Sequence, residues 1–128
     1  MKRFLTTLVV AATLMGCSSD DDKKTTNAQV TVKTTSGIAV SGITVYAYGE
    51  DTWSVSGDDT FFADGQSVTS STGVAKFNNI EYPFTYVGNN QETFRFSAHY
   101  SKNGVNYTKV VGQTITKGES AVVTITVN

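Results

Sequence analysis

Residues 92–112 read ETFRFSAHYSKNGVNYTKVVG, and this stretch decides the class of fold. In its first half, apolar residues alternate with polar ones, at Phe94, Phe96, Ala98 and Tyr100. Side chains along a strand point to its two faces in turn, so a period of two indicates a strand with one buried face. Asn103-Gly104 then favours a type I′ hairpin turn, because both residues tolerate positive φ. The stretch therefore predicts two strands, near residues 92–101 and 104–113, joined by a tight turn.

The same period of two recurs along the chain from Ala28 onward. It predicts five further strands, near residues 28–35, 43–49, 66–70, 74–80 and 119–127. No window shows the pattern of an amphipathic helix. Seven short strands in about 100 residues bury too little as one open sheet, whereas two sheets packed face to face bury enough. We therefore expect an all-β chain in which residues 28–128 form a single seven-stranded β-sandwich.

The first 16 residues stand apart from this domain. A positive start with Lys2 and Arg3 precedes residues 4–15, which are apolar apart from three threonines. This run is too short to span a bilayer, which takes roughly 20 apolar residues, and it suits the apolar region of a signal peptide. Removing residues 1–16 leaves eight basic and eleven acidic residues, a net charge of −3. That balance does not indicate nucleic acid as a partner, which calls for a clustered basic face.

The only cysteine follows this run directly. Leu14-Met15-Gly16-Cys17 resembles the lipobox of bacterial lipoproteins. In that family the cysteine thiol is joined to a diacylglycerol and the signal peptide, here residues 1–16, is cut just before it. The resemblance implies that Leu14 is an apolar anchor, that Gly16 is the small residue at the cut, and that Cys17 carries the lipid. The alternative is an ordinary secretory peptide that is cut elsewhere.

An acid run follows the cysteine. It comprises Ser18, Ser19, Asp20, Asp21 and Asp22. Like charges repel, so residues 17–27 are expected to form an extended linker between lipid and domain. The run also resembles the export signal that carries lipoproteins to the cell surface in some Gram-negative lineages. We expect an outer-membrane protein on the cell surface, with the periplasmic face as the alternative.

Three stretches of the domain carry a second resemblance. Residues 30–48 (VTVKTTSGIAVSGITVYAY), 67–80 (SVTSSTGVAKFNNI) and 121–128 (AVVTITVN) resemble carboxypeptidase regulatory-like and transthyretin-like domains. In that family the fold is usually a non-catalytic module, so the resemblance implies no catalytic residue. A general immunoglobulin-like sandwich is the alternative, although the chain lacks the Cys and Trp spacing of true immunoglobulin domains.

The remaining residues offer little chemistry. An enzyme needs a nucleophile beside a base, paired acids or a metal set. His99, the only histidine, is expected to face solvent, because it lies on the strand face opposite Phe96 and Ala98. No second histidine or cysteine completes a zinc site. Three acids, Asp58, Asp59 and Asp64, match no calcium-loop spacing. We therefore expect no catalytic residue, no metal site and no cofactor.

Residues 50–65 form the one informative irregularity. This connection exceeds a tight turn and carries five residues of interest, Trp53, Asp58, Asp59, Phe61 and Phe62. Apolar bulk is unusual in a surface loop. The aromatic residues either fold back to cap one end of the sandwich or form a contact site for a protein or a glycan. The expected function is a protein-interaction or assembly module, with glycan binding through the loop around Trp53 as the alternative.

Overall fold

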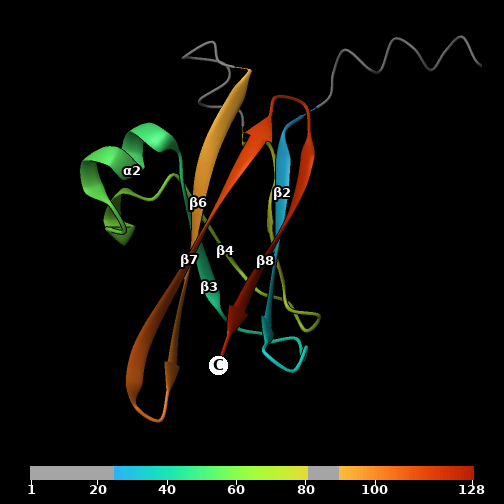
Figure 1. The fold of residues 1–128 in the computed structure, drawn as a ribbon, viewed down its shortest axis with the longest axis vertical. Coiled ribbons are helices and arrows are strands. Elements are labelled where there is room, and N and C mark those ends of the chain that lie inside the picture. The colour runs from blue at the N-terminus through green and yellow to red at the C-terminus, as the bar shows by residue number, and fades with distance from the viewer. Residues whose placement is uncertain (1–24, 81–89) are drawn as a thin grey trace, which may run out of the picture.

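The computed structural model describes residues 25–80 and 90–128 (Figure 1). The predicted signal peptide, the predicted lipidation site Cys17, the acid run and most of the linker lie outside these residues.

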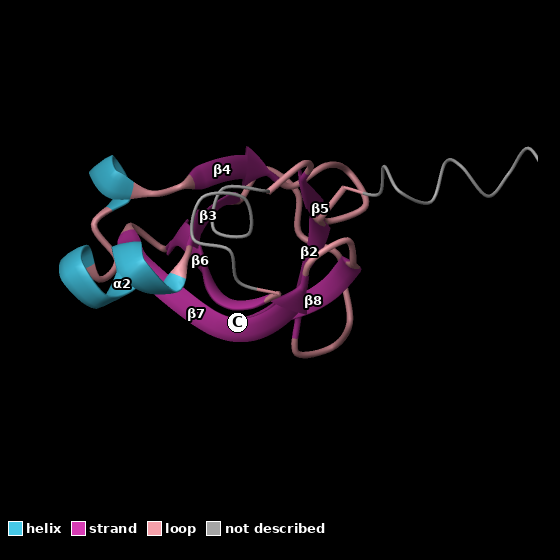
Figure 2. Cartoon of the chain, turned by 90° about the horizontal axis from the view of Figure 1, so that it is seen from above, coloured by secondary structure: helices cyan, strands magenta, loops and turns pink. Residues whose placement is uncertain are grey.

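Seven strands form two sheets, which confirms the all-β sandwich (Figures 1 and 2). The three-stranded sheet has the order β5 (Val74–Phe77), β2 (Asn27–Thr34), β8 (Ser120–Val127). The four-stranded sheet has the order β4 (Gly65–Val68), β3 (Thr44–Tyr48), β6 (Gln91–Lys102), β7 (Val105–Thr116). Neighbouring strands run antiparallel, except that β2 and β8 are parallel.

The predicted hairpin is the longest pairing in the fold. Strands β6 and β7 pair from Gln91 with Thr116 to Lys102 with Val105. Asn103 and Gly104 have φ values of 55° and 78°, as a type I′ turn requires. The hairpin is therefore confirmed, and β7 runs three residues further than the sequence predicts.

The core lies between the two sheets and follows the predicted alternation. In β6 the side chains of Phe94, Phe96 and Ala98 are buried, and in β8 every second residue from Ala121 to Val127 is buried. The Phe77 ring of one sheet packs on the Phe96 ring of the other, with centroids 5.4 Å apart. Burial of this apolar surface is the main favourable term in the stability of the sandwich.

The connection between β3 and β4 holds two short helices that the sequence analysis missed. They are α2 (Glu50–Ser56) and the 3₁₀ helix η2 (Thr60–Phe62). Figure 2 shows both beside the four-stranded sheet, on the side away from β2. Neither contains a buried residue, so neither has the apolar stripe from which a helix is recognised in sequence. The interpretation of this segment as a cap on one end of the sandwich is wrong, because it covers an outer sheet face.

Candidate functional site

The site is built on residues 49–64, which we call the docked segment. Its central anchor is the Asp58 carboxylate. Tyr48 Oη donates to Asp58 Oδ1 at 2.7 Å, and Ser97 Oγ donates to Oδ2 at 2.6 Å. His99 Nε2 lies 3.1 Å from Oδ2. Tyr48 and Ser97 are fully buried, so Asp58 satisfies two hydroxyl groups that have left water.

Asp58 also changes the acidity of its partner. Burial raises the pKa of the Tyr48 phenol above its ordinary value of 10.0, and the hydrogen bond to Asp58 and the negative charge of that carboxylate raise it further. Each cause favours the neutral phenol, which keeps its proton to donate to Asp58. The Tyr48–Asp58 bond is therefore maintained well into the alkaline range.

The prediction that His99 faces solvent is wrong in part. The side chain does lie on the face opposite Phe96 and Ala98, as the alternation requires. That face is covered there by the docked segment, so His99 is half-buried, with Tyr46 packed edge-on at 5.0 Å. The alternation along β6 predicted the correct face for His99, but it does not indicate which segment covers that face.

A serine, a histidine and an aspartate thus meet in one cluster, yet their order is not that of a catalytic triad. In a triad the base lies between the nucleophile and the acid. Here the Asp58 carboxylate lies between Ser97 and His99, and Ser97 is fully buried. The Ser97 hydroxyl is committed to a carboxylate, so the cluster holds the docked segment and activates no nucleophile.

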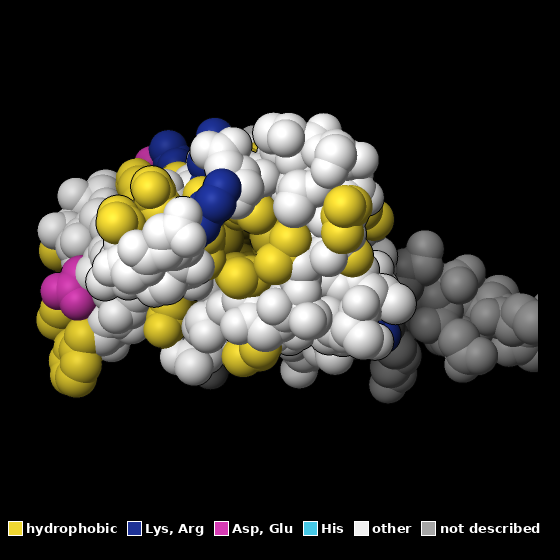
Figure 3. All heavy atoms as spheres, turned by 90° about the horizontal axis from the view of Figure 1, so that it is seen from below, with side chains coloured by type: hydrophobic (Ala, Val, Ile, Leu, Met, Phe, Trp, Pro, Cys, Tyr) yellow, Lys and Arg dark blue, Asp and Glu magenta, His cyan; other side chains and the backbone are white. Residues whose placement is uncertain are grey.

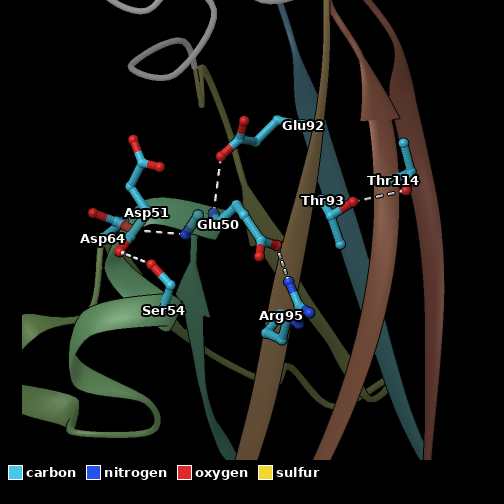
Figure 4. A network of polar contacts seen from close by, with 9 residues as sticks. Glu50, Asp51, Ser54, Asp64, Glu92, Thr93, Arg95 and Thr114 are labelled. Atoms are coloured by element: carbon cyan, nitrogen blue, oxygen red, sulfur yellow. Dashed lines mark hydrogen bonds and ion pairs between the residues drawn. The ribbon is translucent and has the colours of Figure 1, made fainter.

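A second anchor holds the start of α2. Helix N-termini expose unsatisfied N–H groups, and α2 has no capping side chain of its own. Asp64 Oδ2 accepts from the backbone N–H of Gly49 at 2.7 Å, and Glu92 Oε2 accepts from that of Glu50 at 2.9 Å (Figure 4). Asp64 is the last residue of the docked segment, 15 positions from Gly49, and Glu92 lies on β6, so the helix start is held both within the segment and by the sheet.

A third anchor involves the only tryptophan. The Trp53 ring is half-buried, packs edge-on to Tyr48 with centroids 5.4 Å apart, and has the Arg95 guanidinium 5.8 Å from its centre. Arg95 also forms an ion pair with Glu50 (Figure 4). Trp53 is therefore engaged by the sheet and gives the docked segment a third point of attachment.

Two aromatic residues of the docked segment are left exposed. Phe61 is 84% exposed and Phe62 is 54% exposed. Their rings contact each other at 90°, with centroids 5.0 Å apart. Asp59 caps η2 by accepting from the Phe61 backbone N–H at 3.1 Å. We call Phe61 and Phe62 the aromatic knob, because they project from a short helix that is fixed at its start.

A cavity of about 300 Å³ lies beside the start of α2. Its walls include Asp51, Asp64, Lys76, Phe77, Glu92 and Phe94. Asp64 and Glu92 already accept hydrogen bonds from the helix start. Within residues 25–80 and 90–128, no three His, Cys, Asp or Glu side chains are grouped as a metal ion requires. Neither helix of the described part is long and apolar enough to cross a bilayer.

The five residues predicted as a binding loop thus have different roles. Trp53 and Asp58 face the sheet and hold the segment, Asp59 caps η2, and Phe61 and Phe62 are exposed. The anchoring partners on the sheet were missed: Tyr48, Glu92, Arg95 and Ser97. A signal for two of them exists, since Arg95 and Ser97, together with His99, place polar groups on one face of β6.

No protein-family model matches the chain, and no curated protein is similar to it in sequence. The resemblances to the lipobox and to the carboxypeptidase regulatory-like domain therefore stay predictions.

Proposed function

We propose that this protein is a lipoprotein, held in the outer membrane through Cys17 and displayed on the cell surface. Its β-sandwich is a non-catalytic module that binds another protein through the aromatic knob. The lipobox resemblance and the acid run support the anchor and its location. The exposure of Phe61 and Phe62 supports the binding role.

The exposed aromatic pair is the observation that carries the binding role. Large apolar side chains exposed on a rigid element are typical of contact residues, and aromatic residues dominate the binding energy of protein interfaces. The segment that presents them is attached through Asp58, Trp53 and the start of α2. Because the segment is already held in place, binding costs little conformational entropy, which favours affinity.

The shape of the knob favours a protein over a glycan. A sugar ring stacks on an open aromatic face, whereas the two knob rings meet at 90° and form no common platform. Trp53, the residue on which the glycan alternative rests, is engaged by Tyr48 and Arg95. A convex apolar projection instead fits a pocket on a protein surface.

Photo-cross-linking on intact cells tests the binding role. A benzophenone amino acid at position 61 is expected to give one constant protein adduct, because the knob would lie inside the partner's pocket. Position 122 on β8, where Val122 is 70% exposed, is the matched control and should give none. Equal adducts from both positions, or none from position 61, would refute the binding role.

Labelled palmitate and surface proteolysis test the anchor and its location separately. The protein should take up label, Cys17→Ser should not, and protease added to intact cells should remove the domain. Label in the Cys17→Ser variant would exclude the anchor, and complete protection on intact but not lysed cells would place the domain on the periplasmic face. Loss of glycan retention on Phe61→Ala, with no protein adduct, would favour the glycan alternative.

A further inference from the structure

Charge is segregated along this chain. Residues 34–75 contain five acids and no Lys or Arg, and residues 93–118 contain one arginine and three lysines and no acid. The first range includes the docked segment, and the second includes most of the β6–β7 hairpin. Within the chain only Glu50 with Arg95 and Asp58 with His99 are paired among the described residues. Asp59 and the hairpin lysines Lys102 and Lys109 form no ion pair within the described ranges.

The hairpin presents an apolar face between those lysines. Residues paired across two strands lie on the same face of the sheet. Lys102 pairs with Val105, Tyr100 with Tyr107, and Ala98 with Lys109. All six therefore lie on the face that turns toward the core in the body of the sandwich. Toward its tip the hairpin projects past the other sheet (Figure 1), and Val105 and Tyr107 are 50% and 43% exposed.

This exposed face is the hairpin patch, defined as Tyr100, Lys102, Val105, Tyr107 and Lys109. The Tyr100 and Tyr107 rings stack with centroids 5.5 Å apart. A shallow hollow near its base is lined mainly from the opposite face of the hairpin, by His99, Ser101, Asn106 and Thr108, and it also touches Tyr100 and Tyr107. Figure 3 views the molecule from this end, where apolar side chains surround a hollow and basic side chains lie at its rim. Acidic side chains lie beside a separate apolar group at the left edge.

The two surfaces complement each other. The knob is convex and apolar with Asp59 beside it, whereas the patch is apolar with Lys102 and Lys109 beside it. We propose that the aromatic knob of one copy docks on the hairpin patch of a second copy of this chain. This inference rests on the proposed function, for which it names the partner. The contact joins two different surfaces, so copies associate either reciprocally as a twofold pair or head to tail in rings or chains.

The lipid anchor makes a small contact of this kind effective. A knob of two side chains buries less than a stable interface needs, so the contact is weak in solution. Confinement of all copies to one membrane raises their effective concentration, as linking does for tethered modules. Opposite charges at the rim steer the encounter, and salt weakens them because the Debye length falls from about 10 Å at 0.1 M to about 3 Å at 1 M.

The test uses the lipidated full chain in vesicles, with ¹⁴N and ¹⁵N copies mixed. A carbodiimide joins a carboxylate to an amine that it contacts, and mixed-isotope products identify joins between copies. We expect Asp59 to be joined to Lys102 or Lys109 between copies, with lower yield at 1 M salt. Lys76, exposed on β5 of the other sheet, is the control amine. Absence of these joins, or equal joining of Asp59 to Lys76, would overturn the proposal.

Exchanging the charges of the two surfaces distinguishes an effect on docking from an effect on folding. With a benzophenone at position 107, Asp59→Lys should lower the yield of joined copies about two- to five-fold, the worth of an exposed ion pair. Adding Lys102→Glu and Lys109→Glu should restore the yield, which a purely structural role of Asp59 would not do. Lack of restoration in a folded triple variant would overturn the proposal.

The outcomes also separate this inference from the proposed function. A position-61 adduct with a different protein on cells, without joined copies in vesicles, would refute self-association and leave the binding role intact. The absence of any position-61 adduct in both settings would refute both. Adducts made only of joined copies would support both.

Discussion

Replacing Asp58 by alanine removes the shared acceptor of the docked segment. Tyr48 Oη and Ser97 Oγ then lose their partner, and both side chains are fully buried in the wild-type structure. A buried donor left without a partner costs about 1–3 kcal/mol, so the two hydroxyls together set a range of about 2–6 kcal/mol. The segment can also detach, which lets water reach both groups. The variant adopts whichever response costs less free energy, either unpaired hydroxyls or a detached segment. We expect a loss of about 3 kcal/mol in the stability of the docked state.

Two optical probes distinguish the two responses during urea denaturation. Trp53 is the only tryptophan and lies on the docked segment, so its fluorescence follows detachment. Far-ultraviolet circular dichroism follows the sheets. In the wild type both probes should give one transition, because the segment is anchored to the sheet. In Asp58→Ala the fluorescence transition should move to lower urea and precede the change in dichroism.

Asp59→Ala is the matched control for this experiment. Asp59 is exposed, and in the described structure its side chain accepts only the Phe61 backbone N–H, an end cap worth about 1 kcal/mol. In Asp59→Ala the fluorescence and circular dichroism transitions should still coincide. The reasoning would be refuted if Asp58→Ala destabilised the protein no more than Asp59→Ala does, because the buried hydroxyls would then not depend on Asp58.

Three further predictions concern Tyr48, Gly73 and the aromatic knob. Folding raises the pKa of Tyr48, so the stabilisation that its neutral phenol provides is fully present below pH 10. Above pH 10 the free energy of unfolding should fall by about 1.4 kcal/mol per pH unit on account of this group. In Tyr48→Phe the fall of stability with alkaline pH should be shallower by that amount. Gly73 has φ +79°, and an added Cβ would lie 2.8 Å from the Val32 carbonyl oxygen, so Gly73→Ala should lower the unfolding free energy by about 3 kcal/mol. Gly37→Ala, with φ +90° and open space, should cost only the backbone strain of about 1–2 kcal/mol, and equal losses would contradict the clash. Joint replacement of Phe61 and Phe62 by alanine should leave the free energy of unfolding within about 0.5 kcal/mol of wild type, and a larger loss would show that the pair serves folding.

The sandwich could be predicted because its signals are local. Alternation marks each strand by its own residues, and Asn103-Gly104 fixes the longest pairing through its positive φ values. The strand boundaries agree with the predicted ones to within three residues. What alternation does not give is the order of strands in each sheet, because several pairings bury the same faces.

The site was only partly predictable because its contacts are distant in sequence. Composition drew attention to Trp53, Asp58 and the aromatic knob, which do lie on one segment. Composition could not say which of them turn inward. That depends on the polar outer face of β6, where Ser97 accommodates Asp58 across 39 positions of sequence. The helix start is likewise held by Glu92, 42 positions from its partner Glu50.

The manner of docking bears on why the knob is aromatic. The docked segment is attached chiefly by polar contacts and one half-buried ring, and it contributes no residue to the core between the sheets. The packing of the sandwich therefore places no demand on the identity of positions 61 and 62. Two large apolar side chains there add exposed apolar surface and gain little from the fold, so their presence is better explained by a surface that covers them. The same reasoning applies to Val105 and Tyr107, because a shorter hairpin that lacked its tip would lose no residue of the core. Two apolar surfaces that the fold does not require, with opposite charges beside them, are the strongest argument that both belong to one contact.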